Sequence, residues 1–347
     1  MEKDKFLITE ETQNIFNTSN KTFYFAKVNV HENIFSEDLD NIIKNEIPRV
    51  IESATDIKLN SSTISFTDII KTQIEDKTII MGHVTNSKKE KMRFKEGPTT
   101  YFTMSEKEIA NSALFIYDIE SEILAFTTAS KISIADFITY FTKLLSQDPM
   151  VGTVIIKTLP ERYDLIKEFK VLDKITSVKF SLIQPNPRTR HYNLYNKIIG
   201  ETKAKTLDVT IKEDSDGIDI GVTKKVSNQK ITQEEDSPKQ LTLPLEESTS
   251  LQMQDESSNQ EFSNDEEQFN QPISDGIELV NNGYGEIVIK GETYSYISQG
   301  GKRKKEKKIS HKKTFKSKES IKKLAVKGLD TFRAINKVVQ YIKDLKF

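Results

Sequence analysis

The residue types most able to do chemistry in this sequence are cations placed next to aromatic rings. Two short segments show this pattern: Lys88, Lys89, Lys91, Arg93 and Lys95 beside Phe94, and Arg188 and Arg190 beside Tyr192 after a Pro-Asn-Pro turn. Lysine and arginine contact phosphates, and an aromatic ring can stack on an unpaired base. Both segments therefore predict nucleic-acid contacts, and the alternative interpretation is that each is an ordinary solvated loop.

The C-terminal segment carries a stronger basic signal. Residues 302–347 contain 17 Lys or Arg and four acids, a net charge of +13, and they begin with Lys302, Arg303, Lys304, Lys305, Lys307 and Lys308. A cationic segment of this size would release many counterions from a polyanion. The chain has no helix-turn-helix or zinc-finger spacing for reading bases, so we expect weakly sequence-specific binding, to DNA ahead of RNA.

Clustered carboxylates indicate a different chemistry. A metal-dependent nuclease holds Mg²⁺ with two or more acids. One candidate set is Asp118, Glu120 and Glu122, and a second is Glu213, Asp214, Asp216 and Asp219 around Gly217. The second set lacks the regular spacing and the closing Glu of a calcium loop. We interpret both sets as solvated surface acids, and we assign no catalytic residue, no metal site and no cofactor.

Several reaction classes lack their usual residues. The chain has no cysteine, which excludes disulfides, thiol nucleophiles and thiolate zinc sites. Its four histidines, His31, His83, His191 and His311, are scattered without a local zinc-binding spacing. Neither a GxxxxGK[ST] phosphate loop nor a GxGxxG turn occurs.

The chain that carries these segments has 347 residues, of which 36% are hydrophobic and 30% are charged, and its net charge is -1. No run approaches the roughly 18 apolar residues of a membrane span, and the first ten residues are charged, so we expect a cytoplasmic protein without stable membrane insertion. The small net charge conceals a net charge of -11 between residues 233 and 275. Acidic and basic blocks of this kind are typical of interaction segments, although the two could also neutralise each other.

Hydrophobic periodicity predicts the elements that position these residues. We expect strands at 22–30, 57–66, 77–84, 113–117, 123–127, 151–158 and 175–184, and helices from Ser36 to Ile47, from 132 to 145 and from 161 to 169. Residues 87–98 form a polar connection. Short, half-polar strands in this order indicate an α+β fold, with a mixed, largely antiparallel sheet and helices on one face.

The domain organisation follows from shifts in composition. Residues 1–223 form an α+β body, with an optional division into 1–96 and 97–223, and residues 224–272 form a disordered acidic linker. Residues 273–301 return to the body as a short helix and a β-hairpin across Gly291. Residues 302–347 form a basic tail that ends in an amphipathic helix from about Ser320 to Leu345.

Three ordered runs carry a resemblance: SALFIYDIESEILAFTT, ISIADFITYFTKLL and TVIIKTLPERYDLIKEFKVLDKITSVKFSLIQPNP. They resemble an uncharacterised bacterial family known only as a domain of unknown function. FYFAKVNV is similar to its opening strand, and NNGYGEIVIKGETYSYIS to its closing element. The layout and the GPTT segment at 97–100 more distantly resemble RexA-like prophage-exclusion proteins and the KwaB-like proteins of Kiwa phage defence. The resemblance supplies no catalytic residue.

The resemblance implies a cytoplasmic prokaryotic protein of a phage-defence or mobile-element locus that binds nucleic acid and forms a homodimer. Together with the basic segments it favours a non-enzymatic nucleic-acid-binding protein, with a partner protein encoded in the same locus as a further expectation. Two alternatives stay open. One is a metal-dependent nuclease that uses the acids above, and the other is an adaptor whose basic tail docks an acidic partner protein.

Overall fold

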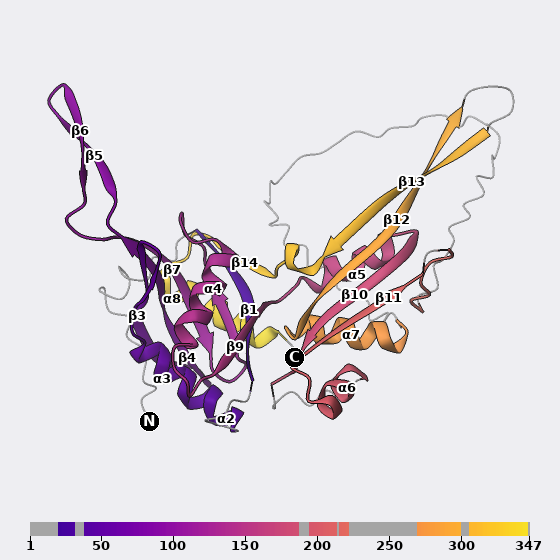
Figure 1. Cartoon of the computed structure of the whole chain (residues 1–347), viewed down its shortest axis with the longest axis horizontal. Helices are drawn as coiled ribbons and strands as arrows, with labels where there is room; N and C mark the ends of the chain where they lie inside the picture. Colours follow the sequence, from indigo (N-terminus) through magenta and orange to yellow (C-terminus); the bar gives the residue numbers. More distant parts are fainter. Residues whose placement is uncertain are drawn as a thin grey trace, which may run out of the picture. The chain divides into compact units, whose positions relative to one another are not determined.

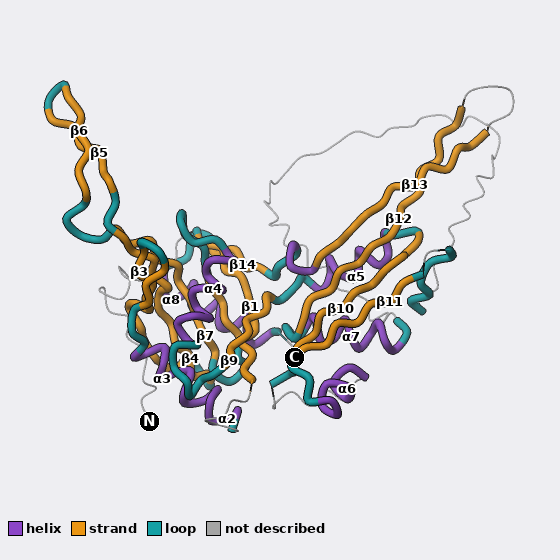
Figure 2. Tube along the Cα trace, in the orientation of Figure 1, coloured by secondary structure: helices purple, strands orange, loops and turns teal. Residues whose placement is uncertain are grey.

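The computed structural model describes residues 20–31, 38–186, 194–213, 215–221, 269–299 and 305–345. Residues 1–218 and 271–347 belong to one compact unit, and residues 219–270 form a second. In the first unit the strands β2 to β8 (57–126) follow one another without a helix, and helices and strands alternate from α4 to β12 (134–299) (Figure 1, Figure 2). Within the described ranges every strand pairing is antiparallel. The predicted α+β class with a largely antiparallel sheet is confirmed.

The larger sheet has eight strands, in the order β14-β1-β8-β7-β4-β3-β2, with β9 also paired to β1. Their bounds are β1 Lys21–His31, β2 Ile57–Leu59, β3 Ser62–Ile74, β4 Lys77–Lys88, β7 Ile109–Asp118, β8 Ile123–Phe126, β9 Thr153–Thr158 and β14 Lys323–Val326. Residues 113–117 of β7 and all of β8 are apolar without a break because both of their faces are buried.

Each face of this sheet has its own hydrophobic core. Phe115 and Tyr117 of β7 point into one core, which is covered by α2 (Leu39–Asn41), the π-helical segment η1 (Ile42–Glu46), α3 (Ile47–Ser53) and α4 (Ile134–Leu145). Leu114 and Ile116 point into the other, which is covered by α8 (Thr331–Asp344). Neighbouring residues thus alternate between the two cores, as the pleat of a strand requires. The C-terminal helix therefore covers a sheet face that the sequence did not assign to any helix.

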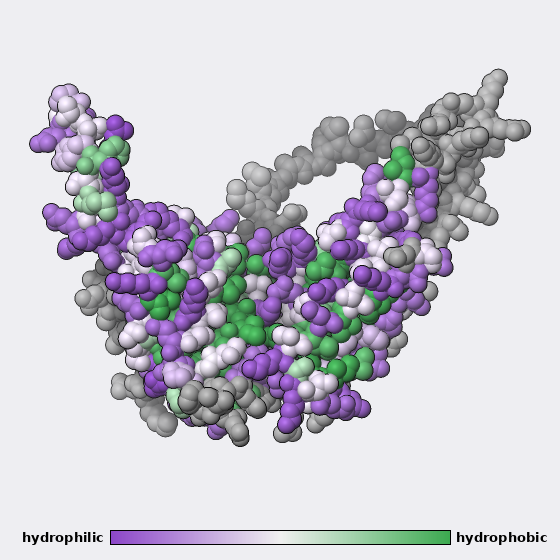
Figure 3. Space-filling view, viewed as in Figure 1, coloured by the Kyte–Doolittle hydropathy of each residue, from purple (hydrophilic) through white to green (hydrophobic). Residues whose placement is uncertain are grey.

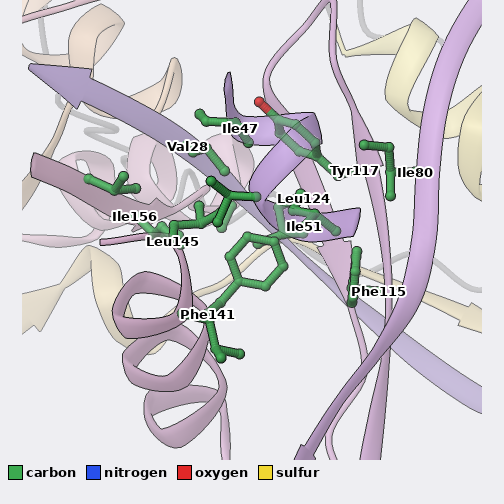
Figure 4. Close-up of a cluster of buried hydrophobic side chains, with 14 of the residues drawn as sticks. Val28, Ile47, Ile51, Ile80, Phe115, Tyr117, Leu124, Phe141, Leu145 and Ile156 are labelled. Atoms are coloured by element: carbon green, nitrogen blue, oxygen red, sulfur yellow. The ribbon is translucent and has the colours of Figure 1, made fainter. Parts of the chain in front are cut away.

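Helix α4 illustrates how local sequence builds the core. Its N-cap, Ser133, accepts a hydrogen bond from the backbone N–H of Asp136, whose side chain in turn accepts from the N–H of Ser133. Phe141 then projects into the first core, where its ring meets Phe66 and Phe115 at centroid distances of 5.1 Å and 5.2 Å (Figure 4). The predicted helix at 132–145 is confirmed.

The first helical run departs from its prediction. It was expected to begin near Ser36, which lies outside the described residues, and to end before Pro48. The N-cap is Asp38, and the helical run continues through Pro48 to Ser53. Pro48 is the second residue after the π-helical segment, and this widened turn accommodates a residue that has no N–H to donate.

The smaller sheet has four strands in the order β11-β10-β12-β13. The bounds are β10 Lys174–Ile183, β11 Thr206–Lys212, β12 Gly285–Gln299 and β13 Lys305–Lys316, and the helices packed on this sheet are α5 Arg162–Val171, α6 Leu194–Thr202 and α7 Gln271–Asn281. Gly276 of α7 lies directly on the ring of Phe180, where a Cβ atom would collide with it. The helix can approach the strand this closely only because residue 276 has no side chain.

The C-terminal third contains two wrong predictions. The hairpin expected across Gly291 does not form, because β12 runs straight through this residue and pairs along its length with β13. The helix expected from Ser320 begins only after Asp330, its N-cap. Residues 323–326 instead pair with β1 as β14, and Gly328, at φ 65°, separates that strand from α8. Backbone pairing with β1 overrides the helical periodicity in this stretch.

Candidate nucleic-acid interface

The second half of the basic segment at 88–95 lies on a two-stranded hairpin, where the sequence predicted a polar connection; Lys88 is the last residue of β4 and Lys89 follows it. Strands β5 (Lys91–Glu96) and β6 (Thr99–Met104) are joined by Gly97 and Pro98, with Gly97 at φ 55°. A two-residue loop of this type needs a positive φ, which glycine adopts without strain. All twelve residues of the two strands are exposed. The hairpin extends beyond the end of the β4–β7 ladder (Figure 1).

One face of the hairpin combines cations with an aromatic ring. Lys91, Arg93 and Lys95 alternate along β5, and Phe102 lies opposite Arg93 on β6. The Lys91 Nζ and Arg93 Cζ atoms each lie 5.3 Å from the centroid of the Phe102 ring. Arg93 also donates a hydrogen bond of 3.0 Å from Nε to Thr100 Oγ1. Phe102 therefore holds two cations in place at the surface.

The opposite face of the hairpin carries exposed apolar side chains. Phe94 and Tyr101 lie directly opposite each other, and their rings stack with a centroid distance of 6.0 Å. They are 40% and 49% exposed, and Met92 adds to the same face. Hydrophobic and hydrophilic side chains lie next to one another on the hairpin (Figure 3). The basic pattern at 88–95 did not point to Tyr101 and Phe102, although the run TTYFTM after Gly97-Pro98 is rich in β-branched and aromatic residues, which is a strand signal.

At the base of the hairpin, lysine side chains interact with the Glu90 carboxylate and stabilise the structure. Ser105 donates its backbone N–H to Glu90 O at 2.8 Å, and its Oγ accepts from the backbone N–H of Glu90 at 3.0 Å. Lys131 hydrogen-bonds the Glu90 carboxylate and lowers its pKa, and Lys88 lies 3.8 Å from the same carboxylate. No ion pair involving the four remaining cations occurs among the described residues; these are Lys89, Lys91, Arg93 and Lys95.

The other predicted contact residues do not join the hairpin. Arg188, Arg190, Lys302, Arg303 and Lys304 lie outside the described residues. Lys305, Lys307 and Lys308 belong to β13 of the four-stranded sheet. The Lys308 Nζ atom lies 3.5 Å above the ring centroid of Tyr294 on β12. The structure therefore brings together the first basic segment and places Lys308 on a separate surface.

Two carboxylates of the first acidic set are buried, which corrects their interpretation as solvated surface acids. Asp118 is buried and accepts hydrogen bonds from the Glu120 N–H at 3.0 Å and from Ser121 Oγ at 2.6 Å. Lys77 lies 3.4 Å from Asp118 and 3.3 Å from Glu120. These acids hold the β7–β8 turn and are balanced by a lysine.

Glu122 belongs to a different cluster. It is 2% exposed, has a φ of 60°, and lies 3.2 Å from the Nζ atom of the buried Lys27. Asn186 donates a hydrogen bond to the same carboxylate, donates a second to Val28 O at 3.0 Å, and accepts one from the Val30 N–H at 3.0 Å. The cluster joins β1 to the segment that follows β10, so Glu122 performs a structural role.

Members of the second acidic set and His83 also have local partners. Glu213 accepts a hydrogen bond from the backbone N–H of Ser215 at 2.8 Å, while Asp214 and His191 lie outside the described residues. His83 Nδ1 lies 3.0 Å from Asp68 Oδ2, yet burial lowers the pKa of His83. In the part of the chain that the structure describes, no three His, Asp or Glu side chains are grouped to hold a metal ion.

The fold and the exposed hairpin together define a small antiparallel α+β protein with a projecting basic and aromatic ribbon. Residues 20–232 match the family described as Domain of unknown function (DUF4747), which is more than half of the chain, and the chain belongs to this family. The matched range includes the hairpin and ends before α7, so the segment at 281–298 lies beyond it. No curated protein and no solved structure matches the chain. Across the described ranges no helix is both long and apolar enough to cross a membrane.

Proposed function

We propose that this chain is a non-enzymatic nucleic-acid-binding protein that contacts DNA with little sequence specificity. In this proposal it acts in the cytoplasm as a homodimer, within a phage-defence or mobile-element locus that also encodes a partner protein. The resemblance to RexA-like and KwaB-like proteins supports the defence setting. The β5–β6 hairpin supports the DNA contact.

The observation that carries the proposal is the exposure of cations and rings on both faces of one ribbon. A two-stranded ribbon fits the major groove of duplex DNA, where its two faces meet the groove walls. Lys91, Arg93 and Lys95 supply phosphate contacts on one face. Phe94 and Tyr101 supply apolar contact on the other. A hairpin that served only as a connection would not need three exposed rings.

The test is a salt series of binding to a 30-base-pair duplex. The hairpin variant combines Lys91→Ala, Arg93→Ala and Lys95→Ala. The control variant removes three exposed lysines elsewhere, through Lys44→Ala, Lys58→Ala and Lys197→Ala. Each lost phosphate contact lowers the slope of log K against log salt by about 0.9, so the hairpin variant should lose about 2.7 from that slope. An equal loss in the control variant would refute the hairpin as the contact.

A further inference from the structure

The four-stranded sheet has one face without a covering helix among the described residues. Val178, Phe180 and Leu182 of β10 are buried. Gly276 of α7 and Tyr195 of α6 both pack against Phe180, and Lys313 of β13 pairs with Glu168 of α5. The three helices therefore lie on the side of the sheet to which Phe180 points. The alternate residues of β10 point to the opposite side.

The register gathers lysines from four strands on this uncovered face. Residues directly opposite each other in an antiparallel ladder share a face. Ser177 of β10 lies opposite both Lys212 and Lys290, Lys179 lies opposite Thr210 and Val288, and β13 continues the face through the pairs Val288–Lys316 and Glu292–Lys312. We call the resulting set the sheet-face lysines: Lys179, Lys212, Lys290, Lys308, Lys312 and Lys316.

The charge on this face is neutralised only in part. Among the residues whose side chains the structure describes, the acids that share it are Asp208, Glu286 and Glu292, and Lys316 lies 3.3 Å from Glu319. Asp208 lies 3.6 Å from Lys179, and Glu286 lies 2.8 Å from Lys157 of β9. Within the described ranges Lys212, Lys290 and Lys312 are exposed and belong to no ion pair. Serine and threonine hydroxyls lie between the cations and add hydrogen-bond donors.

We propose that the uncovered face of β10, β11, β12 and β13 is a second nucleic-acid site that binds the phosphate backbone of duplex DNA. This inference rests on the proposed function, and it combines Lys308, Lys312 and Lys316 of the predicted basic segment with lysines of β10, β11 and β12 that the sequence did not single out. Along β13 the lysines from 308 to 316 span about 27 Å at about 3.4 Å per residue. Duplex DNA presents roughly 16 phosphates over that length. The face is thus long enough to meet several phosphates at once.

The side chains favour a duplex over a single strand. Sites for single strands place aromatic rings where bases can stack on them. The ring described on this face is Tyr294, and the Lys308 ammonium already lies 3.5 Å above it. Lysines and hydroxyls on a flat sheet contact the backbone without reading bases. Contact with the phosphate backbone alone fits weak sequence specificity. The hairpin would then contact the groove, and the sheet would contact the phosphates.

The experiment compares four full-length proteins: the wild type, the hairpin variant, the control variant, and a sheet-face variant with Lys212→Ser, Lys290→Ser and Lys312→Ser. Each is titrated with a 30-base-pair duplex and with a 30-nucleotide single strand from 50 to 200 mM salt. From 50 to 200 mM salt, the affinity of the wild type for the duplex should fall about 40-fold more than the affinity of the sheet-face variant falls, because the variant has lost three phosphate contacts. The control variant should behave as the wild type does, and circular dichroism melting shows that each variant is folded.

The outcomes separate this inference from the function on which it rests. If only the hairpin variant weakens, the sheet-face site is wrong and the nucleic-acid function stands. If the sheet-face variant weakens and the hairpin variant does not, the sheet is the main contact and the inference stands. If the wild type fails to bind at 50 mM salt, both proposals are wrong. Binding to phosphatidylserine vesicles as tight as to the duplex, with the same lysine dependence, would overturn the duplex as the ligand.

Discussion

The buried ion pair between Lys27 and Glu122 makes the sharpest stability prediction. The two residues are 5% and 2% exposed, and their charged atoms lie 3.2 Å apart. Lys27 also donates a hydrogen bond of 2.8 Å to the backbone oxygen of Ser121. The substitution Lys27→Met keeps an unbranched side chain that is one atom shorter and removes its charge. It leaves the Glu122 carboxylate buried, with Asn186 as its donor.

The expected cost follows from this geometry. Removing one partner of a buried pair destabilises a protein by about 3–5 kcal/mol, because the remaining charge is neither solvated nor balanced. The double variant Lys27→Met with Glu122→Gln removes both charges and should cost about 1–2 kcal/mol. The two substitutions together should therefore cost less than Lys27→Met alone. Such strong coupling is expected only for residues in direct contact.

The assay is urea unfolding at pH 7, followed by circular dichroism, with the free energy of unfolding extrapolated to water. Lys44→Met is the matched control, since Lys44 is exposed and pairs with Asp40 on the surface. It should cost less than about 1 kcal/mol. A cost below 1 kcal/mol for Lys27→Met, or a double variant that costs the sum of the singles, would refute the reasoning.

Three further predictions follow from the core, the histidines and the hairpin. Phe141→Ala should lower the free energy of unfolding by about 3–5 kcal/mol in the same urea assay, because its buried ring fills a core between Phe66 and Phe115. Burial, and then the charge of Lys205, lower the pKa of His31 in the folded protein. As the pH falls, His31 is therefore protonated in the unfolded state before it is protonated in the folded state. The contribution of His31 to the free energy of unfolding is complete above the ordinary pKa of about 6.5, and below it this free energy falls by up to about 1.4 kcal/mol per pH unit. Unfolding from pH 7.5 to 5 should show this loss, and His31→Gln should flatten it; an unchanged slope would contradict the assignment. Phe94→Ala with Tyr101→Ala should weaken duplex binding at every salt concentration without changing the slope of log K against log salt, because the two rings supply apolar contact and no phosphate contact; a smaller slope would contradict this role.

Elements with a strong local pattern could be predicted from the sequence. Ser133 and Asp136 mark the start of α4, and its apolar residues recur at helical spacing, so both the start and the buried side of this helix were readable. The short apolar runs at 113–117 and 123–127 were recognisable as strands, and they lie in β7 and β8. The same reading failed at residues 320–326, where helical spacing continued but the backbone pairs with β1. The local pattern of a segment carries no information about which distant strand has a free edge for backbone pairing.

The candidate site also has features that the local sequence predicts and features that it does not predict. The basic character of residues 88–95 and the ring among them can be read from the sequence, because those residues are neighbours in the chain. The fold is needed to show that Tyr101 and Phe102 lie opposite β5, and that Glu122 is buried beside Lys27, 95 positions earlier in the chain. It also assembled Lys179, Lys212, Lys290 and Lys312 on one face from four strands. The physical reason is that charge and periodicity are local properties, whereas burial and convergence depend on the register between segments far apart in the chain.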